Sequence, residues 1–187
     1  MVYRISLINH MNTFENSKRL SYRRLEEWDF SLFSDLYSDE RVMQYTYLDL
    51  CSDQGKIMEQ FREILDEWRY LHFVATIRES NIPIGFIFYE IILEHPHGGI
   101  AEIGFILKPE FWGNGYATEM AKAMIKSCFE QTSIHKVIGC CNVNNTHSEK
   151  ILRKIGMKKE GRARRVRYKH YEWWDEVQYG LLREEYI

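Results

Sequence analysis

The sequence predicts a mixed α/β domain in which helices cover a central sheet. First, the 187 residues are about the size of one domain, and 45% of them are apolar, which is enough for a packed core. Second, strand-like and helix-like patterns follow one another as strand, two helices, three strands, helix, strand, helix and two strands. Third, no internal repeat and no Gly-, Ser- or Pro-rich linker divides the chain. We therefore expect a single domain over residues 18–187.

The first third of the chain predicts one strand and two helices. Residues 1–17 are polar and irregular, so we expect an N-terminal extension, with an edge strand as the alternative. Residues 18–25 are typical of a strand. Apolar side chains recur at helical spacing over residues 29–37. Ser52 or Asp53 is suited to cap the second helix. The apolar stripe of that helix comprises Ile57, Phe61, Ile64, Leu65 and Trp68.

The middle of the chain predicts three strands separated by turns. Apolar residues alternate over residues 73–77, and an Asn-Ile-Pro turn follows at residues 81–83. Residues 84–93 form a long apolar run, which is typical of a strand buried on both faces. A second turn at residues 95–99 leads into a third strand over residues 101–107.

The last third predicts two helices, one strand between them and a closing strand pair. A wide apolar stripe indicates a helix over residues 117–129, and residues 137–141 are typical of a strand. A short helix over residues 145–155 comes next. Residues 164–171 and 177–182 then predict an antiparallel pair that completes the sheet.

Composition excludes several classes of protein. The net charge of −2 gives no general attraction to nucleic acid or to acidic membranes. No uncharged apolar stretch approaches 18 residues, so we expect no membrane partner. The four cysteines form no CxxC pair, which favours a reduced, cytoplasmic location, and Cys140 and Cys141 are expected in the core. The seven histidines show no metal-ligand spacing, so we expect no metal.

The stretch Gly113-Asn114-Gly115 carries the clearest chemical signal. It lies between a predicted strand and a predicted helix, where glycine lets backbone N–H groups approach a ligand. The helix that follows adds its positive dipole end, so the turn is suited to a pyrophosphate. It is neither a P-loop nor a dinucleotide fingerprint, because the required Lys and third Gly are absent. By itself the pattern also fits a plain structural turn.

A wider stretch around these glycines resembles a known family. Residues 101–119, AEIGFILKPEFWGNGYATE, closely resemble motif A of the GNAT superfamily of acetyl-CoA-dependent N-acetyltransferases. Residues 142–157 resemble the second signature of that family. Further matches near the two ends of the domain are Arg19, Leu20, Arg23 and Asp29, and Trp174, Asp175 and residues 182–185. The resemblance covers the chain from about residue 18 onward and is closest to the RimJ/RimL type.

The resemblance implies a fold and a co-substrate. In this family a mostly antiparallel mixed sheet contains a splayed parallel strand pair, and acetyl-CoA binds where the pair opens. It implies that the pantetheine arm lies along the backbone of Phe105, Ile106 and Leu107. It implies that the pyrophosphate is held by the backbone amides of Trp112, Gly113, Asn114, Gly115, Tyr116 and Ala117. It also implies that Asn145 bonds the pantetheine or orients the thioester.

One residue departs from the family pattern. The family often carries Gln or Arg three residues before the first glycine of the phosphate loop, and this chain has Glu110. An inward-pointing acid would disfavour a pyrophosphate. The backbone amides still supply the donors, so we expect acetyl-CoA to bind.

Acetyl transfer to an amine requires a neutral nucleophile, and this points to a base. A lysine-type amine has a pKa of about 10.4, so making it neutral at pH 7 costs roughly 4 kcal/mol. A general base lowers that cost, and Glu102 is our first candidate because it lies on the strand beside the implied cofactor. The Ala-Glu-Ile sequence around Glu102 also resembles the strand that carries the acidic residue in related histone acetyltransferases. Glu90 on the neighbouring strand is the second candidate, and a solvated strand glutamate is the structural alternative.

The departing thiolate of CoA needs only a weak proton donor, since a thiol pKa is near 8.5. Ser148 occupies the corresponding position in the RimL-like proteins, so the resemblance implies that it is this donor. Ser148 could equally be a helix-surface hydroxyl that only touches the cofactor. Tyr168, Tyr171 and Tyr179 stay open as alternative donors.

The sequence leaves the acceptor amine open. A ribosomal protein N-terminus, an amino acid, a polyamine and an amino sugar are all compatible with the pattern. The two N-terminal helices should form the acceptor pocket, lined by Trp28, Tyr45 and Tyr47. Trp173 and Trp174 are either an aromatic pair of the hairpin or part of the acceptor wall. Either a monomer or a homodimer fits the sequence.

Residues 150–170 are unusually basic. They hold ten Lys or Arg and one Glu, a charge of +9, which leaves −2 − 9 = −11 for the rest of the chain. The simplest interpretation is a solvated hairpin near the adenosine 3′-phosphate of CoA, although direct nucleic-acid binding is not expected of the enzyme. Two alternatives from other classes are a catalytically silent acyl-CoA-binding sensor or scaffold, and a ribosome- or RNA-docking protein.

Overall fold

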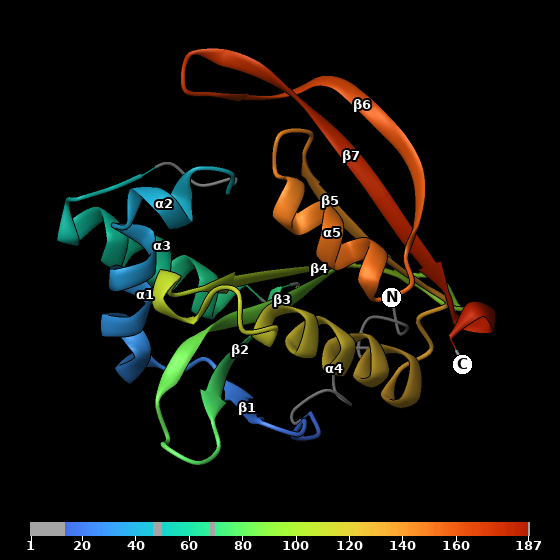
Figure 1. The fold of residues 1–187 in the computed structure, drawn as a ribbon, viewed down its shortest axis with the longest axis horizontal. Helices are drawn as coiled ribbons and strands as arrows, with labels where there is room; N and C mark the ends of the chain where they lie inside the picture. Colours follow the sequence, from blue (N-terminus) through green and yellow to red (C-terminus); the bar gives the residue numbers. More distant parts are fainter. Residues whose placement is uncertain (1–13, 47–49, 68–69, 187) are drawn as a thin grey trace.

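The computed structural model describes residues 14–46, 50–67 and 70–186, and it shows one sheet with helices packed on both faces (Figure 1). The strands of the described part are β1 Leu20–Arg24, β2 Tyr70–Ile77, β3 Pro83–Leu93, β4 Ile100–Leu107, β5 Lys136–Asn142, β6 Lys158–Lys169 and β7 Glu172–Leu182. The α-helices are α1 Phe30–Tyr37, α2 Glu40–Met43, α3 Gln54–Asp66, α4 Tyr116–Gln131 and α5 Thr146–Lys154. Short 3-10 helices are η2 Glu27–Asp29, η3 Pro109–Phe111 and η4 Arg183–Glu185.

The sheet order confirms the predicted mixed topology. The strands lie in the order β1-β2-β3-β4-β5-β7-β6, and every neighbouring pair is antiparallel except β4 and β5. The parallel pair is short: it runs only from Ile100 opposite Lys136 to Glu102 opposite Ile138. Because β4 continues to Leu107 and β5 to Asn142, the two strands separate beyond Glu102. The predicted opening of the parallel pair is therefore present.

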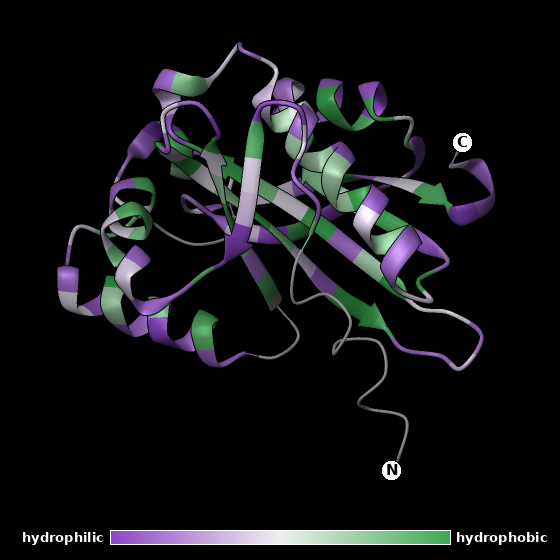
Figure 2. Ribbon diagram, turned by 90° about the horizontal axis from the view of Figure 1, so that it is seen from below, coloured by the Kyte–Doolittle hydropathy of each residue, from purple (hydrophilic) through white to green (hydrophobic). Residues whose placement is uncertain are grey.

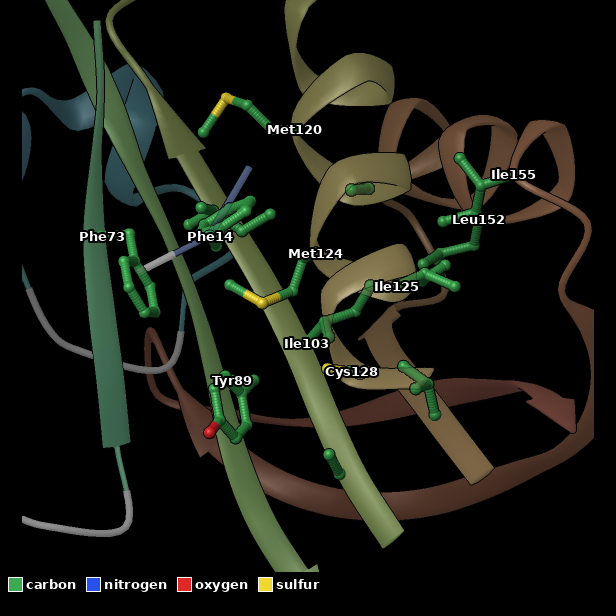
Figure 3. Packing of buried hydrophobic residues seen from close by; sticks show 14 of the residues in the cluster. Phe14, Phe73, Tyr89, Ile103, Met120, Met124, Ile125, Cys128, Leu152 and Ile155 are labelled. Carbon is green, nitrogen blue, oxygen red and sulfur yellow. The ribbon is translucent and has the colours of Figure 1, made fainter. Parts of the chain in front are cut away.

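Alternation along the strands produces two cores, one on each face of the sheet. On one face α4 and α5 pack against side chains such as Tyr89 and Ile103, as Figure 3 shows for Met120 and Met124 of α4. The other face carries a second cluster, in which α1, α2 and α3 cover β2 and β3. The helical residues of that cluster are Leu32, Phe33, Leu36, Tyr37, Val42, Met43, Ile57 and Phe61. Purple and green segments accordingly alternate along the central strands in Figure 2.

The helix starts follow local capping chemistry. The Asp53 carboxylate accepts hydrogen bonds from the N–H groups of Gly55 and Lys56, so Asp53 and not Ser52 caps α3. Helix α3 ends at Asp66, and Trp68, the last residue of the predicted apolar stripe, lies outside the described residues. The four-residue helix α2 was not predicted, because one turn is too short for a periodic pattern.

The closing strands are longer than predicted, and the turn between them lies elsewhere. We expected strands over residues 164–171 and 177–182, but β6 starts at Lys158 and β7 at Glu172. The turn consists of His170 and Tyr171, both with positive φ, which is the requirement of a two-residue hairpin turn. Neither residue is a Gly or Asn turn signal. In β6 nearly every side chain is exposed, so no apolar alternation marked that strand.

β6 is the outer edge of the sheet and carries the basic segment. Its twelve residues hold seven Lys or Arg and one Glu. A bulge interrupts its pairing with β7 between Ala163 and Arg167, and Arg165 in the bulge has a φ of 51°. Much of the positive charge of residues 150–170 is neutralised locally. The basic residues there that form ion pairs are Arg153, Lys158, Lys159, Arg162 and Arg167.

The described end of the predicted extension packs on the domain. Phe14 is buried and stacks on Tyr22, with ring centroids 4.2 Å apart. Across the described parts of the chain, none of the helices combines the length and the apolar character needed to cross a membrane.

Candidate functional site

The phosphate-loop candidate is tied to the first strand of the sheet. Arg19, the residue just before β1, donates a hydrogen bond from Nη1 to the Asn114 carbonyl oxygen at 3.0 Å. Its Nε lies 2.7 Å from Oε2 of Glu119, and its guanidinium lies over the Tyr116 ring at 4.3 Å. One arginine therefore fixes both the loop and the first turn of α4. This role could not be predicted from a local pattern, because 95 residues separate Arg19 from Asn114.

The loop itself requires its glycines. Gly113 and Gly115 have φ values of 77° and 78°, a conformation that residues with a side chain rarely adopt. A Cβ at Gly113 would meet no atom within 4 Å, so this side of the loop is open. Gly115 is the N-cap of α4 and provides no side-chain cap for the first N–H groups of the helix. An anion could therefore satisfy those donors, so the residues present fit a pyrophosphate.

Further residues that we expect to bind acetyl-CoA lie in β4 and in the loop that follows it. Phe105, Ile106 and Leu107 belong to the part of β4 that has separated from β5, so one edge of their backbone has no partner strand in the described structure. The Trp112 indole N–H bonds the Leu107 carbonyl at 2.9 Å and holds the loop against the end of the strand. Glu110 is exposed on η3.

Glu102 lies at the point where β4 and β5 begin to separate. It is the last residue of β4 to pair with β5, and on the other side it faces Glu90 of β3. Its side chain is partly buried. Burial raises the pKa of Glu102 from the ordinary 4.5 to about 6, and the Glu90 carboxylate adds to the rise. Glu102 is thus a carboxylate whose protonation state changes near neutral pH.

Cys140 of β5 is a partner of Glu102 that the sequence did not indicate. We expected both neighbouring cysteines in the core, but alternation places them on opposite faces, and only Cys141 belongs to the core cluster. The Cys140 thiol lies beside the Glu102 carboxylate, and its interaction with the charged form opposes the rise of the Glu102 pKa. Burial raises the pKa of the Cys140 thiol, so it stays protonated. The parallel register that joins these two residues has no local sequence signature.

The two candidate residues at the start of α5, Asn145 and Ser148, are joined by a helix-capping hydrogen bond. Oδ1 of Asn145 accepts a hydrogen bond from the Ser148 backbone N–H at 3.1 Å, so Asn145 is the N-cap of the helix. This bond uses the carbonyl end of the amide, and the NH₂ end is still a donor. Ser148 is partly buried in the first turn.

The three alternative tyrosine donors differ in their surroundings. The Tyr179 hydroxyl is buried, donates to Oε1 of Glu149 at 2.5 Å and accepts from Nε of Arg153 at 2.9 Å. Its proton is therefore engaged in a structural network. Tyr168 and Tyr171 are exposed on the β6–β7 hairpin.

The tip of the β6–β7 hairpin contacts the last residue of α2 and the segment that follows this helix. Lys169 is 3% exposed, and its Nζ donates to the carbonyl oxygens of Met43 at 3.0 Å and Thr46 at 2.7 Å. The ring centroids of Tyr45 and Trp174 are 6.3 Å apart. Trp173 instead is exposed on the opposite face of β7, so the two tryptophans do not form one pair.

The other residues that we expected to line the acceptor pocket are Trp28 and Tyr47. Trp28 is 72% exposed on η2, and its ring lies 6.0 Å from the Arg23 guanidinium. Tyr47 lies outside the described residues. No group of three or more His, Cys, Asp or Glu side chains suited to a metal ion occurs in the described part of the chain.

Comparisons with known proteins agree with this architecture. The N-acetyltransferase YnaD of Bacillus subtilis, itself uncharacterised, is 31% identical over 171 residues, covering 91% of this chain and 97% of that protein. The B. subtilis protein YdaF, named as a candidate ribosomal N-acetyltransferase, is 35% identical over 182 residues, covering 94% and 98%. A crystal structure of a GNAT-family acetyltransferase from Bacillus anthracis superposes with a TM-score of 0.80 at 28% identity, covering 92% of this chain and all of that one.

A more distant structure shows the same fold. The Vibrio cholerae spermidine N-acetyltransferase, solved with CoA and spermine, has a TM-score of 0.79 at 20% identity, with 90% and 98% coverage. Residues 19–158 of this chain match the family described as the acetyltransferase (GNAT) domain. Together with the glycine loop and the opened β4–β5 pair, these matches show that the chain belongs to the GNAT family of acetyltransferases.

Proposed function

We propose that this protein transfers the acetyl group of acetyl-CoA directly to a primary amine, with Glu102 as the general base. The observation that carries the proposal is the position of Glu102. It lies where the edge of β4 becomes free, and burial raises its pKa to about 6. Such a carboxylate is ionised at pH 7 but is a stronger base than an ordinary glutamate. It is therefore suited to take the proton of an ammonium acceptor.

The co-substrate would be held by main-chain groups. The amides from Trp112 to Ala117 would bind the pyrophosphate, and the free edge of residues 105–107 would bind the pantetheine arm. Asn145 would use its NH₂ group toward the pantetheine. Bound acetyl-CoA supplies the activated acetyl group. Ser148 would donate a proton toward the departing sulfur, because it lies in the first turn after Asn145.

We propose a cationic amine as the acceptor. Glu90, Glu102 and Glu176 all lie near one another at the opening, and Glu176 faces Asn142 of β5. An ammonium group is attracted to such a set of carboxylates. Relatives supply two classes to test: the spermidine acetyltransferase suggests a polyamine, and YdaF suggests a protein N-terminus of the RimJ/RimL type. A cytoplasmic location would suit both.

The first test is release of free thiol from acetyl-CoA with a panel of amines. The panel contains spermidine, lysine, glucosamine and peptides with free Ala or Ser N-termini. We expect turnover with at least one class, a loss of about 100-fold or more in kcat for Glu102→Gln, and a smaller loss for Ser148→Ala. Glu94→Gln is the matched control, because Glu94 is exposed just after β3.

Two outcomes would contradict the proposal. Full activity in Glu102→Gln would remove Glu102 from the chemistry. Tight CoA binding by calorimetry with no thiol release on any amine would instead favour an acyl-CoA-binding module without turnover.

A further inference from the structure

Glu102 is surrounded by charged or polar groups from four other strands. Glu90 faces it from β3 and Cys140 from β5. The register continues this face outward, because Glu102 pairs with Ile138 of β5, and Glu176 of β7 pairs with Asn142, two periods of the alternation further along β5. Arg167 of β6 pairs with Trp174 and so lies on the same face as Glu176. The last two belong to the hairpin that ends the sheet, which is remote from Glu102 in sequence. The β6–β7 hairpin therefore places one positive side chain, Arg167, and one negative side chain, Glu176, near the candidate base Glu102.

These two side chains form one ion pair. Nε of Arg167 lies 3.0 Å from Oε1 of Glu176, and Glu176 is only 8% exposed. Glu176 is held in place by the pairing of β7 with Asn142 of β5 and with Ala163 of β6. Two residues after Arg167, buried Lys169 fixes the same strand to the segment after α2. Strand pairing therefore holds Glu176 in place, and the Lys169 hydrogen bonds hold the part of β6 that carries Arg167.

We propose that the Arg167–Glu176 pair is a positioning device for Glu102, in which the two partners control the ionisation of the base in opposite directions. The inference rests on the proposed role of Glu102. A carboxylate at Glu176 disfavours a second negative charge nearby, whereas the Arg167 guanidinium favours it. The pKa of Glu102 is accordingly raised by Glu176 and lowered by Arg167.

A purely structural role accounts poorly for this pair. The same hairpin contains a second ion pair, Arg162 with Asp175 at 2.6 Å, which also supports the bulge through the Arg165 N–H. Strand alternation places Asp175 on the opposite face of β7 from Glu176. The hairpin thus already has an ion pair that joins its two strands. Arg167 is partly exposed, and an ion pair with an exposed partner contributes little to stability.

The test measures the titration of Glu102 in the free protein. Glutamate carboxyl carbons are labelled with ¹³C and followed by NMR from pH 4 to 9, and Glu102→Gln identifies the Glu102 signal. We expect Arg167→Gln to raise the titration midpoint by about one unit and Glu176→Gln to lower it by a similar amount. Arg167→Lys keeps the charge and should restore most of the wild-type value. Arg162→Gln is the matched control and should not move the midpoint.

Kinetics provide the second readout with the best amine of the panel. The acid limb of kcat/KM should move in the same directions as the NMR midpoint, while KM for acetyl-CoA stays within about twofold. A merely structural role would lower the activity of both variants without opposite shifts. If Arg167→Gln does not fold, Glu176→Gln and Arg167→Lys still decide the question.

The outcomes separate this inference from the proposed function. Unmoved or parallel midpoints in Arg167→Gln and Glu176→Gln would overturn the inference, even if Glu102→Gln is inactive. Full activity in Glu102→Gln would overturn the role of the base instead, and with it the inference.

Discussion

At the scale of single residues, the molecule keeps a carboxylate where its charge is costly. Burial and Glu90 both disfavour the ionised form of Glu102, and only Cys140 and Arg167 oppose them. A group with a raised folded-state pKa contributes stability that is fully present below its unfolded value, and that contribution is lost as the pH rises through the folded value. For Glu102 the window runs from about 4.5 to about 6.

This window gives a prediction about stability. Glu102→Gln replaces the carboxylate by a neutral group of the same shape, so we expect the variant to be more stable than the wild type at pH 8, by up to about 2 kcal/mol. Below pH 4.5 the two proteins should unfold alike, because Glu102 is then protonated. Urea unfolding at both pH values measures this. Glu94→Gln is the control, and an equal gap at both pH values would argue against a buried charge.

At the scale of elements, the β6–β7 hairpin reaches across the opening to the helical side of the molecule. Lys169 connects its tip to the backbone of Met43 and Thr46, and Trp174 lies close to Tyr45. The segment after α2 is therefore held by strands that lie more than 120 residues later in the chain. The side of the molecule on which we propose that the acceptor binds depends on this long-range contact.

We predict that Lys169→Met loosens the hairpin tip and weakens acceptor binding. Two carbonyl groups would lose their donor, and such a loss costs about 1–3 kcal/mol when the site stays buried. KM for the acceptor should rise by roughly tenfold, with KM for acetyl-CoA unchanged, and hydrogen exchange should increase over β6 and β7. Lys158→Met on the same strand is the control, because Lys158 pairs with Glu185 at the far end. Equal effects of the two variants would refute the link.

The elements also show what sequence alone could reveal. The apolar stripes of α3 and α4 and the glycine loop were readable, because each is a local pattern. The lengths of β6 and β7 were not, because an exposed basic strand has no apolar period and the turn residues His170 and Tyr171 are atypical. The contact of Cys140 with Glu102 depends on a parallel register, which only the assembled sheet defines.

At the scale of the whole molecule, the charge asymmetry is smaller than composition implied. Five of the ten basic residues in segment 150–170 form ion pairs, and Lys169 is buried on backbone carbonyls. In the part of the chain that the structure describes, the exposed cations left over are Lys150, Lys154, Arg164 and Arg165. This favours a solvated hairpin over a dedicated nucleic-acid surface.

We therefore predict weak, non-specific RNA binding. With about four unpaired cations, a plot of log K against log salt for a single-stranded RNA should have a slope of about −3 or shallower. Fluorescence anisotropy with a labelled RNA between 50 and 200 mM salt measures this slope. Arg164→Gln together with Arg165→Gln should reduce it further. A slope near −6, with submicromolar affinity at 150 mM salt, would instead support the RNA-docking alternative.

The charge of β6 has a further consequence for how copies of this protein meet. An outermost strand offers free N–H and C=O groups that can pair with the same strand of another molecule and extend the sheet. Two copies of β6 aligned in this way would bring together the guanidinium groups of Arg164 and Arg165, the two exposed β6 cations that form no ion pair among the described residues. The bulge at Arg165 also breaks the regular spacing that such pairing needs. The β6 edge of the sheet is therefore poorly suited to pair with the same strand of another copy.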